Sequence, residues 1–189
     1  MKKINKDILT WIIIVVFFAV IIIVYNKSNN NYTDLGEQAP TPTKLNPIVE
    51  QNKDKLLKKT DSIGIDVVIT GKWRSNKRQS DLFAKGRSAD GDIVTYAEAG
   101  ESYHNYGLAI DYALRNEHDE VIWDTTYDGN ENGKSDWFEV AEVAKQLGFA
   151  WGGDWHNFKD YSHLQRDFGL SIRQLKNGLR PDIEDAKNK

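Results

Sequence analysis

The most hydrophobic part of the chain lies near its N-terminus, where residues 8–26 are apolar on every face and carry no charge. A helix of this length rises about 28 Å at about 1.5 Å per residue, close to the roughly 30 Å of a bilayer core. The pattern predicts a transmembrane helix over residues 8–26. Because lysines precede the run at Lys2, Lys3 and Lys6, residues 1–7 are predicted to be cytoplasmic and the rest of the chain extracytoplasmic.

A cleaved signal peptide is the alternative interpretation of this run. The apolar core of a signal peptide is ordinarily shorter and ends in small residues before the cleavage site. The run ends in VYNKSNNN, which lacks such residues. An uncleaved anchor is therefore favoured, and we expect a single-pass membrane protein whose main domain is extracytoplasmic.

The remaining pattern divides into three parts. Residues 27–46 are polar, with two prolines and three consecutive asparagines, and are typical of a linker. Residues 47–183 form the predicted domain, and a charged tail follows at 184–189. Helices are expected at 47–59, 76–85, 136–147 and 171–179, and short strands at 63–70, 108–114, 121–123, 149–151 and 162–165. This mixture predicts an α+β fold.

Composition narrows the chemistry. The formal net charge of −3 argues against nucleic acid as the main partner, because phosphate binding requires a basic face. The chain contains no cysteine, which excludes disulfides, thiol nucleophiles and cysteine-ligated zinc. Any metal must therefore be held by histidine, aspartate or glutamate.

Two of the four histidines lie in segments that could build such a site. His104 and Asp111 occur in SYHNYGLAID, and His163 follows Asp160 in DYSHLQ. Asp111 lies within an apolar stretch, where a carboxylate is costly unless it is paired or binds metal; a half-exposed strand with Asp111 facing water remains the alternative. Together His104, Asp111 and His163 offer three N/O ligands with one position left open, as in catalytic zinc sites. Asp160 is the natural candidate for the general base.

Three motifs in this order resemble a known family. SYHNYGLAID resembles the SxHxxGxAxD motif of the peptidases that include D-Ala-D-Ala dipeptidases and carboxypeptidases. WGGDW followed by DxxH resembles the branch of L-alanyl-D-glutamate endopeptidases found in phage endolysins and autolysins, and WRSNKRQSDLFAKGRS resembles that family's GYRSxxxQxxLxxxGR stretch. The resemblance spans roughly residues 65–179.

The resemblance implies a hedgehog/DD-peptidase-like fold, a small antiparallel sheet flanked by helices, here preceded by the transmembrane helix. It implies one Zn²⁺ held by His104, Asp111 and His163. Asp160 would act as the general base, Arg74 would stabilise the oxyanion, and Ser102 would contact substrate at the rim. Trp155 could equally line the cleft or pack in the core. The family usually has Gly-Tyr where this chain has Lys72-Trp73, and proline and an aromatic residue beside the last histidine, where this chain has Ser162 and Leu164; these departures concern local geometry and substrate fit.

A second candidate metal site lies in DGNENGKSDWFE. The spacing fits a calcium loop with Asp128, Asn130, Asn132 and Glu139 as oxygen ligands. Asp136 and Glu139 are also explained as an N-cap and its N3 partner in the first turn of the following helix, which needs no ion.

Taken together, the anchor and the resemblance predict a monomer in the bacterial cell envelope. Its expected function is zinc-dependent hydrolysis of a peptide bond in the peptidoglycan stem peptide, with the L-Ala-D-Glu bond favoured. The alternatives are a D-Ala-D-Ala carboxypeptidase, a zinc-containing cell-wall-binding module without turnover, and a calcium-dependent envelope adhesion domain.

Overall fold

A computed structural model describes residues 6–28 and 32–182. Its centre is a five-stranded antiparallel sheet in the order β2-β3-β6-β5, with β4 paired to β3. The strands are β2 (Val67–Gly71), β3 (Ala109–Arg115), β4 (Val121–Ile122), β5 (Ala150–Trp151) and β6 (His163–Gln165). The central strand β3 lies between β2 and β6 and is almost entirely buried.

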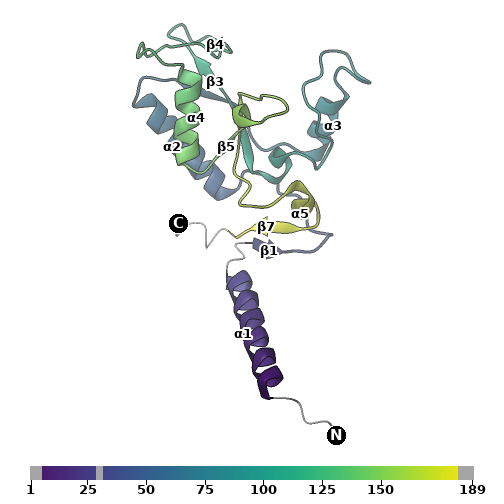
Figure 1. Cartoon of the computed structure of the whole chain (residues 1–189). Coiled ribbons are helices and arrows are strands. Elements are labelled where there is room, and N and C mark those ends of the chain that lie inside the picture. The colour runs from purple at the N-terminus through teal and green to yellow at the C-terminus, as the bar shows by residue number, and fades with distance from the viewer. Residues whose placement is uncertain (1–5, 29–31, 183–189) are drawn as a thin grey trace.

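Helices α2 (Pro47–Asp61) and α4 (Asp136–Gln146) lie side by side against one side of this sheet, as Figure 1 shows. The buried face of α4 is the apolar stripe that the sequence predicts, made of Trp137, Val140, Ala141 and Ala144. Trp137 stacks against Tyr112 of β3, with ring centroids 4.9 Å apart. Because a stripe at this spacing must be covered by other apolar groups, burial against the sheet fixes the position of α4.

Helix α3 (Asn76–Ala84) lies on the opposite flank of the domain, beyond β2 (Figure 1). The side chain of Ser75 caps it by accepting a hydrogen bond from the backbone N–H of Arg78. The one-turn 3-10 helix η1 (Tyr103–Tyr106) leads into β3, and a second, η2 (Gly152–Asp154), follows β5. The α+β domain with an antiparallel sheet agrees with the sequence-based expectation.

A second, two-stranded sheet pairs residues from the two ends of the domain that follows α1. Strand β1 (Tyr32–Asp34) lies antiparallel to β7 (Leu179–Pro181), next to the short helix α5 (Ile172–Lys176). Both strands have three residues, too few for an alternating pattern, and the sequence did not predict them. The range expected as a linker thus contains β1, and its Pro42 carbonyl accepts a hydrogen bond from the Trp73 indole N–H at 2.8 Å.

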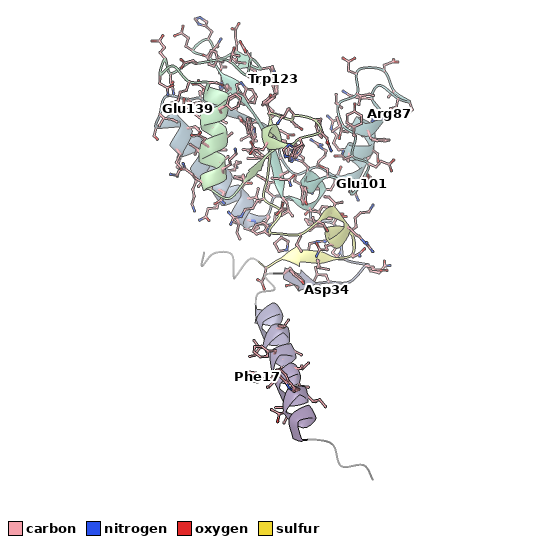
Figure 2. All side chains as sticks on the ribbon, viewed as in Figure 1. Phe17, Asp34, Arg87, Glu101, Trp123 and Glu139 are labelled. Carbon is pink, nitrogen blue, oxygen red and sulfur yellow. The ribbon has the colours of Figure 1, made fainter. Side chains whose placement is uncertain are left out.

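The expected transmembrane helix requires a correction. Helix α1 (Lys6–Ser28) extends away from the domain, and Figure 2 shows the side chain of Phe17 on it. Within the described part of the chain, no helix combines the length and the apolarity needed to cross a membrane. The predicted span over 8–26 and the single-pass localisation are thereby contradicted.

The outermost predicted segments lie largely beyond the part of the chain that the structure describes. Residues 1–5 of the expected cytoplasmic tail and the expected charged tail at 184–189 lie outside the described residues.

Candidate metal centre

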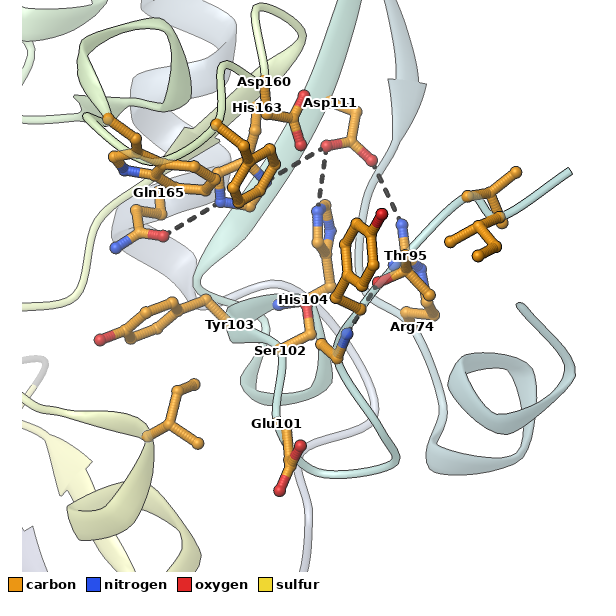
Figure 3. Close-up of a pocket in the computed structure, with 17 residues that line it drawn as sticks. Arg74, Thr95, Glu101, Ser102, Tyr103, His104, Asp111, Asp160, His163 and Gln165 are labelled. Carbon is orange, nitrogen blue, oxygen red and sulfur yellow. Dashed lines mark hydrogen bonds and ion pairs between the residues drawn. The ribbon is translucent and has the colours of Figure 1, made fainter. Parts of the chain in front are cut away.

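The sheet brings together two predicted metal ligands that are distant in the sequence. Strands β3 and β6 are paired so that Asp111 lies directly opposite His163. The third predicted ligand, His104, comes from η1, immediately before β3, and its ring reaches the same point (Figure 3). The three residues expected from the sequence to hold a metal therefore converge at the end of the central strand pair.

The distances within this group suit a single small cation. Asp111 Oδ1 lies 3.1 Å from His104 Nε2 and 3.4 Å from His163 Nδ1. One ligand atom from each side chain lies within 4.8 Å of the other two, and among the described residues this is the one such group of three histidine or carboxylate side chains. Both histidines are buried, and the Asp111 side chain is 20% exposed. The alternative in which Asp111 faces water on a half-exposed strand is therefore wrong.

The carboxylate of Asp111 is held ionised. Burial alone would raise its pKa, but hydrogen bonds and charge interactions with His104 and His163 outweigh burial and hold the pKa well below its usual range. The second oxygen, Oδ2, forms an ion pair with Arg74 Nη2 at 3.3 Å. The two oxygens of this carboxylate therefore contact different partners. Oδ1 faces the two histidines, and Oδ2 faces Arg74.

The residue opposite Asp111 on the neighbouring strand is a glycine, because a side chain would not fit there. Gly71 lies at a register irregularity of β2, opposite Asp111. A Cβ atom at this position would overlap Asp111 Oδ2. A residue with a side chain would therefore push the carboxylate out of its place between the histidines and Arg74.

The donor set fits a metal ion on chemical grounds. His104 Nδ1 lies 2.7 Å from the carbonyl oxygen of Lys72, which can only accept a hydrogen bond, so Nδ1 carries a proton. In the neutral ring the other nitrogen, Nε2, then presents a lone pair to Asp111 Oδ1, which is itself an acceptor. Two acceptors facing each other at 3.1 Å require a proton or a cation near them. Two imidazole nitrogens and a carboxylate oxygen form a ligand set characteristic of catalytic zinc.

The other predicted site residues lie around the same cleft, which has a volume of about 750 Å³. Arg74, Ser102, Trp155 and Asp160 all line it. Asp160 lies three residues before the start of β6 and accepts a hydrogen bond from the Ser162 hydroxyl at 2.9 Å. The ring of Trp155 lies 5.2 Å from that of His163, so this tryptophan is a cleft residue.

Ser102 has a structural contact in addition to its place at the cleft. It is the N-cap of η1, and its hydroxyl accepts from the backbone N–H of His104 at 3.3 Å. The predicted rim residue Ser102 thus also stabilises the turn that carries His104, a predicted metal ligand.

Two glutamines near the site had no assigned role in the sequence. Gln79 of α3 is fully buried; its Oε1 accepts from Arg74 Nη1 at 3.0 Å and its Nε2 donates to the Ala97 carbonyl at 2.7 Å. Gln165 of β6 contacts His163 through Oε1 at 3.1 Å. Two features of the sequence could have pointed to them: Gln79 lies in the WRSNKRQ motif, and Gln165 follows His163 by two residues.

The predicted calcium loop is not supported. The side-chain amide of Asn132 donates to both carboxylate oxygens of Glu139 at 2.9 Å, and the backbone N–H groups of Asn132 and Gly133 donate to Asp128. The loop thus satisfies most of its polar groups internally. The expected N-cap is also different. Ser135 occupies the N-cap position of α4 without a capping hydrogen bond from its side chain, and the carboxylate of Asp136 accepts from the Gly129 N–H.

The sequence of this chain is similar to those of known peptidases. A family model described as D-alanyl-D-alanine carboxypeptidase matches residues 95–166, the stretch that contains His104, Asp111, Asp160 and His163. A peptidoglycan L-alanyl-D-glutamate endopeptidase of Bacillus subtilis, CwlK, is 59% identical over 129 residues, which cover 68% of this chain and 77% of that protein.

More distant relatives were also found. An L-alanyl-D-glutamate peptidase of Listeria phage A118 is 32% identical over 114 residues, 60% of this chain and 35% of that protein. Among solved structures, DacB from Streptococcus pneumoniae D39 aligns with 79% of this chain and 85% of its own at 19% identity, with a TM-score of 0.49. From the identity and coverage of the Bacillus subtilis relative, the chain belongs to the family of peptidoglycan L-alanyl-D-glutamate endopeptidases within the D-alanyl-D-alanine carboxypeptidase-like peptidases.

Proposed function

We propose that the chain is a zinc peptidase that hydrolyses the L-alanyl-D-glutamate bond of the peptidoglycan stem peptide. The observation that carries this proposal is the convergence of His104, Asp111 and His163 in the wall of one cleft. The 59% identity to an endopeptidase of this named specificity supports the choice of bond.

The chemistry begins with the three ligands. A bound Zn²⁺ supplies a Lewis acid that polarises a carbonyl and makes water more acidic. Asp111 contributes a full negative charge to the site because its pKa is held low. His104 and His163 contribute nitrogen ligands that both face Oδ1 of that carboxylate.

Asp160 is the proposed general base. It lies in the cleft next to β6, and a carboxylate at this place can accept the proton of the attacking water and return it to the departing amine. Its hydrogen bond from Ser162 fixes the direction of one oxygen and leaves the other for the water. This division of tasks keeps Asp160 separate from the ligand Asp111.

Arg74 is the proposed stabiliser of the oxyanion. Nη2 is paired with Asp111 and Nη1 with Gln79, so the guanidinium plane is fixed before substrate arrives. Fixed positive charge near a developing oxyanion lowers the barrier because no reorganisation is needed during the reaction. Burial lowers the pKa of Arg74 while Asp111 opposes this, and the group remains a cation.

Ser102 and Trp155 are the proposed substrate contacts. Both line the cleft, and Trp155 offers an apolar ring whose centroid lies 5.2 Å from that of His163. A flat aromatic side chain beside the reacting centre can hold the short aliphatic side chain of alanine.

Digestion of purified muropeptides tests this function. Mass spectrometry of the products should show cleavage between L-Ala and D-Glu, which leaves the alanine on the muramic acid. Release of a single terminal D-alanine would instead favour the carboxypeptidase that the family description names. The absence of any product from zinc-loaded protein would favour a binding module without turnover.

A further inference from the structure

The two proposed histidine ligands are held through opposite ring nitrogens. His104 uses Nδ1 for its hydrogen bond to the Lys72 carbonyl and turns Nε2 toward Asp111. His163 uses Nε2 for its contact with Gln165 Oε1 and turns Nδ1 toward Asp111. The two rings stand 68° from coplanar, with centroids 5.2 Å apart. A histidine can bind a metal only through the nitrogen that carries no proton, so these outer contacts decide which nitrogen is available.

The two outer contacts differ in kind. Lys72 contributes a backbone carbonyl, whose role as an acceptor does not depend on the side chain at that position. Gln165 contributes a side-chain amide, which has an oxygen acceptor at one end and an NH₂ donor at the other. The tautomer of His163 therefore depends on one replaceable side chain and on the orientation of its amide.

Strand geometry places this amide beside the ring. Successive side chains of a strand alternate between faces, so Gln165 projects from β6 on the same face as His163, toward the cleft that both residues line. Leu164, between them, is fully buried in the core. With Oε1 3.1 Å from Nε2, Gln165 accepts the ring proton and leaves the lone pair on Nδ1, the nitrogen 3.4 Å from Asp111 Oδ1.

We propose that Gln165 is a positioning residue that holds His163 in the Nε2–H tautomer and thereby makes Nδ1 available to the metal. This proposal deepens the proposed zinc site and rests on it. Outer hydrogen bonds of this kind orient ligating histidines and typically change metal affinity by about 10–100-fold when removed.

Two substitutions separate the acceptor from the shape of the side chain. Gln165→Met keeps the length and removes the acceptor, whereas Gln165→Glu keeps an acceptor at the same place. Gln146→Met, at the exposed end of α4, is the matched control. Thermal unfolding followed by circular dichroism establishes that each variant is folded before it is compared.

The first measurement uses metal-free protein. The ¹⁵N shifts of the imidazole nitrogens, recorded at pH 8.5 where histidine side chains are ordinarily neutral, report which nitrogen carries the proton. The wild type and Gln165→Glu should show His163 as the Nε2–H tautomer, while Gln165→Met should show a mixture. An Nδ1–H tautomer in the wild type, or no change in Gln165→Met, would overturn the proposal. Should Gln165→Met fail to fold, loss of the Nε2–H tautomer in Gln165→Glu would overturn it as well.

The second measurement is zinc affinity by competition with a chelator. Gln165→Met should bind zinc about 10–100-fold more weakly, and Gln165→Glu and Gln146→Met at least as tightly as the wild type. Unchanged affinity in Gln165→Met would contradict the positioning role and leave the proposed peptidase intact. Failure of the wild type to bind zinc would instead contradict the proposed function, and the tautomer measurement would still decide the role of Gln165.

Discussion

Asp111 and His163 are directly opposed partners on two adjacent antiparallel strands. Their separation is therefore set by the hydrogen-bonded ladder of β3 and β6, and loops contribute little to it. A paired strand is among the stiffest backbone elements, and a metal site needs its ligands held within about 0.5 Å. The third proposed ligand, His104, is brought to the same point by a capped 3-10 turn.

Enlarging Gly71 should damage the metal site from the side of β2. In Gly71→Ala, the new Cβ would overlap Asp111 Oδ2 and force the carboxylate away from Arg74 and the histidines. We expect zinc affinity to fall by at least about 10-fold, since displaced ligands bind more weakly. Zinc titration checks this, with Thr70→Ala, an exposed change on the same strand, as the control. Equal zinc affinity in both variants would show that the carboxylate tolerates the extra methyl group.

The charge of Asp111 should make the metal-free domain less stable in acid. Its folded-state pKa lies below the ordinary value of about 3.9, so its contribution is present above that pH and is lost as the pH falls toward the folded-state pKa. Asp111→Asn should therefore reduce the free energy of unfolding by about 1–3 kcal/mol at pH 6 and by less at pH 3. Urea unfolding of metal-free protein at both pH values measures this. A difference that is the same at both pH values would contradict the depressed pKa.

Gln79 and Arg74 should act as one unit in catalysis. Arg74→Ala should lower kcat/KM by about 10²–10³-fold, and Gln79→Met, which frees the guanidinium, by about 10–100-fold. Because Gln79 acts on the reaction through Arg74, the double variant should be little worse than Arg74→Ala alone. Steady-state kinetics on a muropeptide substrate measures the three values. Additive losses would mean that Gln79 acts mainly through its bonds to Thr95 and Ala97.

Removing the proposed base should separate catalysis from metal binding. Asp160→Ala should keep zinc and lose about 10²–10⁴-fold in kcat, because the proton acceptor is gone while the three ligands remain. Zinc content and hydrolysis are measured on the same preparation. Asp154→Ala, in the same loop and paired with Lys145 on the surface, is the control and should remain active. An Asp160→Ala variant with unchanged turnover would remove Asp160 from the mechanism.

The sequence predicted those features whose cause is local. The periodic apolar stripe of α4 and the β-branched strand β2 follow from residue spacing alone. The sheet of β1 and β7 was missed because each strand has three residues and the pairing joins the two ends of the domain. A hydrophobic run predicted the span at 8–26, which the described helices do not bear out.

In the candidate site, too, some residues could be predicted from the sequence and others depend on the fold. His104, Asp111 and His163 could be proposed because their side chains are limited to a few roles in an apolar or motif context. Gln79 and Gln165 were given no role, because their motif position and spacing do not say which group a glutamine will bond, and its partner is decided by the fold. Gly71 was missed for a related reason, since the need for an absent side chain depends on what faces it across the strand pair.

Anomalous diffraction from crystals grown with zinc gives the most direct test of the central claim. Data collected on both sides of the zinc absorption edge should show one strong site, about 2.0–2.2 Å from His104 Nε2, Asp111 Oδ1 and His163 Nδ1, with a face open to the cleft. A zinc peak held by other residues in catalytically active crystals, or these three side chains without metal, would contradict the assignment of this cluster as the catalytic centre.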